Sequence, residues 1–198
     1  TRPGYPALEA LFDDSAPIFM NWLDAIDSYS ESLLAIGDDA PAPAPRWHQD
    51  WFPRIDAAIG YTVVRQMAPR RIVEIGSGHS TRFFARAVAD GRLETEILAI
   101  DPAPRAALEG LRRVTLDRRT VQEADLASFG GFAAGDILTI DSSHILMPGS
   151  DVDLLRNTVL PTLPPGAIVH FHDIFLPDGY PAVWDWRGYN EQLGVAAL

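Results

Sequence analysis

The chain has 198 residues, no cysteine and a formal net charge of −11, with 16 basic against 27 acidic residues. This charge argues against nucleic-acid binding, which needs a basic face to neutralise phosphates. The lack of cysteine excludes disulfides and zinc–thiolate sites. No apolar run approaches the roughly 18 residues of a membrane span, so we expect a cytoplasmic protein with no membrane partner. Because the chain begins at Thr1 and not at Met, we expect that its natural start is missing, which leaves a removed signal peptide open.

The first 46 residues are expected to form a helical segment and a linker ahead of the main domain, residues 47–198. A single amphipathic helix over 15–37 is predicted by apolar residues at three- and four-residue steps, namely Ile18, Trp22, Ile26, Tyr29, Leu33 and Ile36. The alternating prolines of 38–45 favour an extended, semi-rigid linker. A second helix is expected over 53–67, with a buried face formed by Ile55, Ile59, Val63 and Met67.

From Arg71 onward, short β-branched runs alternate with helical stretches. Strands are expected at 71–75, 96–100, 113–121, 136–140 and 167–172, and helices at 80–90, 103–112 and 151–160, with a short helix at 189–198. This alternation predicts βαβ units and an α/β, Rossmann-like, doubly wound fold with a mostly parallel sheet. The two early helices would form an N-terminal cap on that sheet.

The turn after the first strand, "EIGSGHS", is the place where such a sheet binds ligands. Gly76 and Gly78 allow close approach of a ligand to the backbone, and Ser80 is the expected N-cap of the next helix. Glu74 lies inside an apolar strand, where a carboxylate needs a partner. Asp101 ends the second strand, where a carboxylate can bind the two hydroxyls of a ribose. The alternative is that the glycines only make a tight turn.

The glycine pattern lacks the third glycine of a dinucleotide fingerprint, because Thr81 occupies that position. This argues against NAD or FAD. A ligand with a ribose and no phosphate fits better, and S-adenosylmethionine is such a ligand.

Four motifs, "VEIGSGHST", "ILAIDP", "DILTIDSSH" and "GAIVHFHDIF", resemble in order and spacing the class I S-adenosylmethionine-dependent methyltransferases. The combination of the last two is similar to a bacterial methyltransferase-domain subfamily, and the likeness covers about residues 47 to 192. The resemblance implies that Glu74, Gly76, Ser77 and Gly78 hold the methionine part of the cofactor and that Asp101 holds the ribose. It places adenine against residues 121–126, where Gln122, Glu123 and Asp125 remain alternatives, and Asp141 beside the reacting methyl group.

The family usually closes its sheet with an antiparallel sixth and seventh strand, whereas only about 25 residues follow "HFHD" here. Either the chain continues past Leu198 or the closing hairpin is lost.

The expected rim of the site gathers Asp141, His144, His172 and Asp173 after the fourth and fifth strands. Methylation of a hydroxyl requires a proton to be removed. We expect one of the two histidines to accept it, with His144 favoured. Metal-dependent O-methyltransferases of this class take ligands from the same strand ends, so Asp141, His172 and Asp173 are the expected ligands of a divalent metal. The alternative is that both histidines are structural.

The sequence thus predicts an S-adenosylmethionine-dependent methyltransferase that methylates a hydroxyl of a small-molecule acceptor, such as a sugar. Aromatic residues after "HFHD" either line the acceptor pocket or anchor a loop: Phe175, Tyr180, Trp184, Trp186 and Tyr189. Trp47 and Trp51 present the same choice. Two other functions stay open, namely a nucleoside- or metal-binding protein of the same fold and an NAD-dependent oxidoreductase. No pattern in the sequence specifies the acceptor or the oligomeric state.

Overall fold

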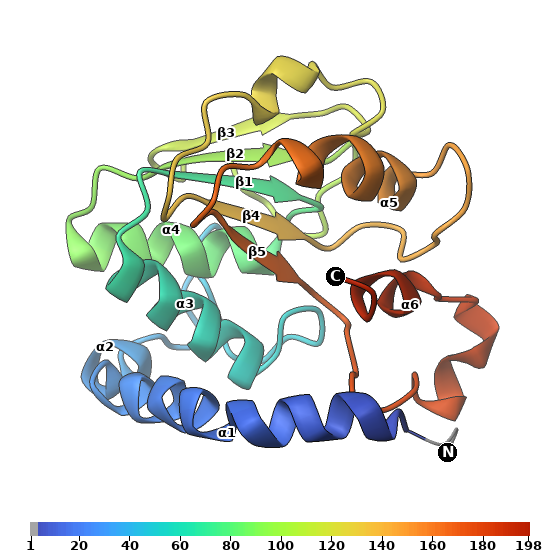
Figure 1. Ribbon diagram of the computed structural model, residues 1–198. Coiled ribbons are helices and arrows are strands. Elements are labelled where there is room, and N and C mark those ends of the chain that lie inside the picture. Colours follow the sequence, from blue (N-terminus) through green and yellow to red (C-terminus); the bar gives the residue numbers. More distant parts are fainter. Residues whose placement is uncertain (1–3) are drawn as a thin grey trace.

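A five-stranded parallel sheet forms the centre of the molecule in the computed structural model, which describes residues 4–198 apart from the side chains of residues 126 and 128 (Figure 1). The strands are β1 (Arg71–Ile75), β2 (Glu96–Ile100), β3 (Val114–Asp117), β4 (Ile137–Ile140) and β5 (Ile168–Phe171). They lie in the order β3-β2-β1-β4-β5, and every pair of neighbours is parallel. The predicted α/β, Rossmann-like fold is confirmed, and within the described residues the sheet has no antiparallel strand.

Helices cover both faces of the sheet, because its strands are apolar on both sides. Ile72, Ile97 and Ile137 pack with α3 (Ile55–Met67) and α4 (His79–Gly91). Val73, Leu138 and Ile140 pack on the opposite face, where α5 (Asp151–Leu154) continues through helical turns at Leu155–Val159 and Leu160–Thr162 (Figure 1). The helices predicted over 80–90 and 151–160 are thereby confirmed.

The N-terminal helix differs from its prediction. It begins earlier, as α1 (Pro6–Asp27), and a non-helical Tyr29 separates it from α2 (Ser30–Leu34). Pro17 lies inside α1 but does not start it, because Pro6 occupies the first turn, where a missing N–H costs nothing. α1 packs against α3, which in turn packs against the sheet (Figure 1).

The predicted buried face of α3 is only partly confirmed, since Ile59 and Val63 are half-buried and Val63 packs against the core. Ile55 and Met67 are 54% and 41% exposed, and the helix instead buries Ala57, Tyr61 and Val64, among others. The buried face of α3 is the one that carries its small residues. A Cβ on Gly60 would lie 2.9 Å from the ring of Phe84 on α4, which is closer than packing allows. The face with the smallest residues therefore lets α3 approach α4 most closely.

Two loops replace elements that the sequence predicted. No helix forms over 103–112, because Asp101 bonds the amide of Ala103 and Gly110 turns the chain at φ +90°. The third strand ends at Asp117, well short of residue 121.

Residues 38–45 are not extended, since the amide of Ala44 bonds the carbonyl of Pro41 and turns the chain back. Near the C-terminus, a 3₁₀ segment (Ala182–Arg187) precedes α6 (Glu191–Val195).

Candidate active site

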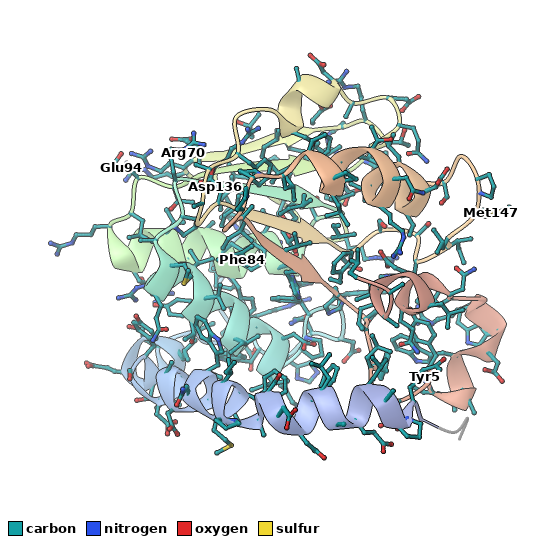
Figure 2. The ribbon with its side chains drawn as sticks, in the orientation of Figure 1. Tyr5, Arg70, Phe84, Glu94, Asp136 and Met147 are labelled. Atoms are coloured by element: carbon teal, nitrogen blue, oxygen red, sulfur yellow. The ribbon has the colours of Figure 1, made fainter. Side chains whose placement is uncertain are left out.

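A cavity of about 750 Å³ opens at the carboxyl ends of the strands. It lies at the ends of β1 and β4, the two strands between which the strand order reverses. This is the ligand position in doubly wound folds. Segments that follow all five strands contribute to its wall, which includes Gly76, Ser77, Asp101, Gln122, Asp141, Ser142, Ser143, His144, His172 and Asp173. Figure 2 shows Met147, another wall residue, at this end of the molecule. The fold therefore brings together most of the predicted site residues.

Gly76 is the residue that lets β1 and β4 end side by side. The amide of Asp141 donates to the carbonyl of Ile75 at 2.8 Å, and Gly76 turns away with φ +78°. A Cβ on Gly76 would lie 1.8 Å from the backbone oxygen of Asp141. Only glycine fits there, so the glycine shapes the cavity and does more than tighten a turn.

Asp101 fixes the conformation of the same turn from β2. Its carboxylate accepts hydrogen bonds from the amide of Ser77 at 2.6 Å and from the Ser77 hydroxyl at 3.0 Å, and another from the amide of Ala103 at 2.8 Å. Asp101 lines the cavity. A carboxylate held in this way remains able to accept hydrogen bonds from a ligand on its open side.

Glu74 and Gly78 lie behind the turn and do not line the cavity. The hydroxyls of Ser80 and Thr81 each donate to the Glu74 carboxyl at 2.5 Å, which supplies the partners that a buried carboxyl needs. Burial raises the pKa of Glu74 to about 8, although these two hydrogen bonds lower it. The N-cap of α4 is Gly78 and not Ser80, because Ser80 lies inside the first helical turn.

The stretch after β3 presents Gln122 to the cavity, together with Thr120 and Val121. Glu123 instead accepts hydrogen bonds from the amide and hydroxyl of Thr120. Asp125 caps the following 3₁₀ turn through the amide of Ala127 at 2.9 Å. Of the three alternatives for the adenine end, Gln122 is thus the one whose position faces the ligand space.

His144 is 2% exposed and lies between two carboxylates. Its Nδ1 is 2.8 Å from Glu191 Oε2, and its Nε2 is 3.2 Å from Asp141 Oδ1. Burial alone would lower the pKa of His144, but the hydrogen bonds with Asp141 and Glu191 raise it to about 9. Both ring nitrogens are engaged, so neither offers a free lone pair to a substrate proton.

His172 faces the same carboxylate from β5. Its Nδ1 lies 3.5 Å from both Asp141 Oδ1 and Asp173 Oδ1, and it is buried without a hydrogen bond. Its Nε2 lies 3.6 Å from Asp56 on α3, an acid that the sequence did not connect with the site. Burial alone would lower the pKa of His172, but the Asp141 and Asp56 carboxylates raise it to about 10.

The histidines act in turn on Asp141. Burial alone would raise the pKa of Asp141, yet His144 and His172 hold it well below its usual range. Burial also raises the pKa of Asp173. His170, two residues before His172, has its ring centroid 6.2 Å from that of His172, but it pairs with Thr139 and does not line the cavity.

The family of the chain follows from comparison with known proteins. A family model described as a methyltransferase domain matches residues 73–174, which is more than half of the chain and contains the glycine turn, Asp101, Asp141 and both rim histidines. The chain belongs to this methyltransferase family. It is an S-adenosylmethionine-dependent methyltransferase, and the oxidoreductase and binding-only alternatives are set aside. A comparison with curated proteins found no match.

Three consecutive residues near the C-terminus of this methyltransferase, 190–192, hold segments of the site in place through hydrogen bonds. The sequence did not predict this role. Asn190 bonds the backbone of Leu146 in both directions, through its Oδ1 at 2.6 Å and its Nδ2 at 3.2 Å. Glu191 holds His144, and Gln192 accepts from the amide of Phe175. All three residues lie outside the matched range 73–174, so the rim is completed by a segment beyond it.

The aromatic residues of the methyltransferase divide between the two predicted roles. Trp51 and Tyr189 line the cavity, where Trp51 stacks under the guanidinium of Arg105 at 3.9 Å. Phe175, Tyr180 and Trp184 pack edge-on against one another or Tyr189 and so anchor the loop, while Trp186 is 80% exposed. Trp47 anchors the N-terminal segment, with its Nε1 donating to the carbonyl of Leu33.

No helix of the described residues is long and apolar enough to cross a bilayer.

Proposed function

We propose that the methyltransferase transfers the methyl group to a hydroxyl of a small-molecule acceptor, at the rim formed by Asp141, His172 and Asp173. The observation that carries this proposal is the buried Nδ1 of His172, which faces two carboxylates and bonds neither. An unsatisfied buried nitrogen is costly, and two converging carboxylates repel each other. A metal ion bound at their centre, in place of a proton on Nδ1, would relieve both costs.

The three side chains fit a divalent metal. One oxygen or nitrogen from each lies within 4.8 Å of the others, and the set of two carboxylates and one imidazole suits Mn²⁺ or a related transition metal. Asp141 ends β4 and Asp173 follows β5, so the ligands come from rigid neighbouring strands. When bound, such an ion supplies a lower pKa for the acceptor hydroxyl.

The remaining groups of the chain orient the reactants. His144 is better placed to fix the Asp141 carboxylate than to accept the substrate proton, since Asp141 and Glu191 occupy its two ring nitrogens. This revises the role predicted for His144. Trp51 and Tyr189 provide apolar walls at which a small acceptor can stack while its hydroxyl points to the rim.

The cofactor end of the cavity fits S-adenosylmethionine, which supplies an electrophilic methyl carbon. Gly76 permits an approach of the two strand ends that any side chain would prevent, Asp101 presents a carboxylate to the ribose, and Gln122 faces the adenine end. The cavity, about 750 Å³, falls within the range of sites for drug-sized ligands and leaves space for an acceptor beside the cofactor.

The proposal is tested by metal binding and turnover together. Mn²⁺ should bind the parent protein in a calorimetric titration, and Asp173→Asn should weaken binding at least tenfold, since it removes a charged ligand. Asp151→Asn is the matched control, because Asp151 lines the same cavity but bonds Ser143. Turnover of S-adenosylmethionine with a panel of sugar and phenol acceptors should fall with a chelator. Turnover that is insensitive to the chelator would refute the proposal that a metal assists methylation of a hydroxyl. An equal effect of both variants on Mn²⁺ binding would refute it too.

A further inference from the structure

A second cavity, of about 500 Å³, lies along α4, away from the strand ends. Its walls come from α4, residues 43–45 and the segment 110–113. Five arginines line it, and Glu94 is its one acidic wall residue: the arginines are Arg82, Arg86, Arg92, Arg112 and Arg113. In a chain with a net charge of −11, this is a local excess of positive charge.

Arg82 is the most informative of the five because it is 6% exposed. Its Nε donates to the carbonyl of Ala107 at 3.0 Å, and one terminal nitrogen reaches the carbonyl of Ala44 at 3.5 Å. No carboxylate within the described residues forms an ion pair with it. A buried guanidinium without a counter-ion is expensive, so its retention at a cavity wall points to an anion that arrives from solution.

The other arginines leave the surplus of charge unbalanced. Arg86 pairs with Asp90 on α4, and Arg113 pairs with Glu94 and Glu96. Arg92 and Arg112 are exposed and, in the part of the chain that the structure describes, have no carboxylate partner. With Arg82, three arginines in the wall of this cavity therefore lack a carboxylate partner among the described residues.

The cavity also has an apolar part to its wall. Its wall residues include Pro43, Pro45, Ala85, Val88, Leu93 and Leu111. A wall that combines arginines with apolar side chains suits a ligand that carries both an anionic head and a short apolar body.

We propose that this second cavity binds a small organic phosphate monoester. A phosphate carries enough charge to balance more than one guanidinium, and its oxygens match the planar donor fork of arginine. The site is separate from the methyl-transfer cavity: His79 lines that one and Arg82 lines this one, three residues further along the first turn of α4. The assignment does not depend on the hydroxyl acceptor.

The test is a calorimetric titration with hexyl phosphate at fixed ionic strength and with S-adenosylhomocysteine in excess, which keeps the first cavity occupied. Hexyl phosphate should bind, and more tightly than inorganic phosphate or hexanol. Arg112→Gln should weaken binding roughly tenfold or more, because it removes a charge-assisted hydrogen bond. Arg82→Gln should weaken it further, and Arg112 remains an exposed alternative if that variant does not fold. Arg118→Gln is the control, since Arg118 lies outside the cavity.

Absence of hexyl phosphate binding to the parent protein would overturn the proposal. The same holds if Arg118→Gln weakens binding as much as Arg112→Gln, because the effect would then be one of net charge alone. Equal affinity for inorganic and hexyl phosphate would overturn the assignment of an organic ligand.

Discussion

The two cavities of this methyltransferase differ in their charged side chains although helix α4 contributes to both: aspartates are mixed with arginines and histidines in the first, whereas arginines outnumber acids in the second. The cavity at the strand ends has four aspartates in its wall, Asp101, Asp141, Asp151 and Asp173, whereas the cavity along α4 has five arginines. Figure 2 marks the two regions by Met147 and Glu94, which lie at opposite ends of the molecule. The acids come from distant segments that the sheet brings together, while two of the arginines follow each other by one turn of α4. The fold therefore determines which charged side chains line each cavity, and the net charge of the chain predicts neither wall.

The largest effect on this comparison is expected from Gly76→Ala. The new Cβ would meet the oxygen of Asp141 at 1.8 Å, at a positive φ, so the strand ends must separate. We expect a loss of more than about 3 kcal/mol in the free energy of unfolding and loss of S-adenosylhomocysteine binding, measured by denaturation and calorimetry. Gly135→Ala is the control, because Gly135 also has a positive φ but faces open space. It should cost about 1–2 kcal/mol and leave cofactor binding intact; equal losses would contradict the account.

A crossed pair of variants tests whether the cavities are independent. Asp101→Asn should weaken S-adenosylhomocysteine binding by about tenfold to a hundredfold, because it removes a charged hydrogen-bond acceptor, and should not change hexyl phosphate binding. Arg112→Gln should do the reverse. Titration of both ligands into both variants gives four affinities, and a variant that weakens both ligands equally would show that the two cavities are coupled.

Glu74 lies beneath the first turn of α4 and should make stability depend on pH. Its pKa is about 8 in the folded protein against an ordinary value of 4.5. Between these values the folded state keeps a proton that the unfolded state releases. The free energy of unfolding should therefore fall with rising pH, by about 1.4 kcal/mol per pH unit, relative to Glu74→Gln. Denaturant titrations of both proteins at pH 5, 6 and 7 measure the difference, and parallel curves would argue against a neutral Glu74.

The smallest effect concerns salt. Raising NaCl from 50 to 200 mM shortens the range of electrostatic attraction, so hexyl phosphate should bind several-fold more weakly. S-adenosylhomocysteine, held largely by shape and hydrogen bonds, should change less. An equal salt response of the two ligands would remove the electrostatic contrast between the cavities.

The sheet and the positions of the Gly76 turn, Asp101 and Asp141 were predictable from the sequence because local patterns determine them. β-Branched runs, the Gly76 turn and the acids that end β2 and β4 follow from strand geometry and topology, and they appear where expected. The buried face of α3 was not predictable, because the close approach at Gly60 and not the largest side chains selects it. The helix expected over 103–112 failed because Asp101 bonds the adjacent loop.

The protonation and partners of the rim could not be read from the sequence, since they depend on contacts between distant segments. His144 and Asp141 are three residues apart, but Glu191, which occupies the other nitrogen of His144, lies 47 residues further along. Asp56 reaches His172 from the opposite direction in the chain. Spacing alone suggested a free base at His144, whereas the folded chain places it between two carboxylates.

The central claim is that the cavity at the strand ends binds S-adenosylmethionine. Calorimetric titration of the parent protein with S-adenosylmethionine, S-adenosylhomocysteine and NAD tests it most directly. The account predicts that the first two bind with one site per chain and compete with each other, and that NAD neither binds nor competes, because Thr81 replaces the third glycine that a pyrophosphate needs. Binding of NAD in the absence of any binding by S-adenosylmethionine and S-adenosylhomocysteine would contradict it.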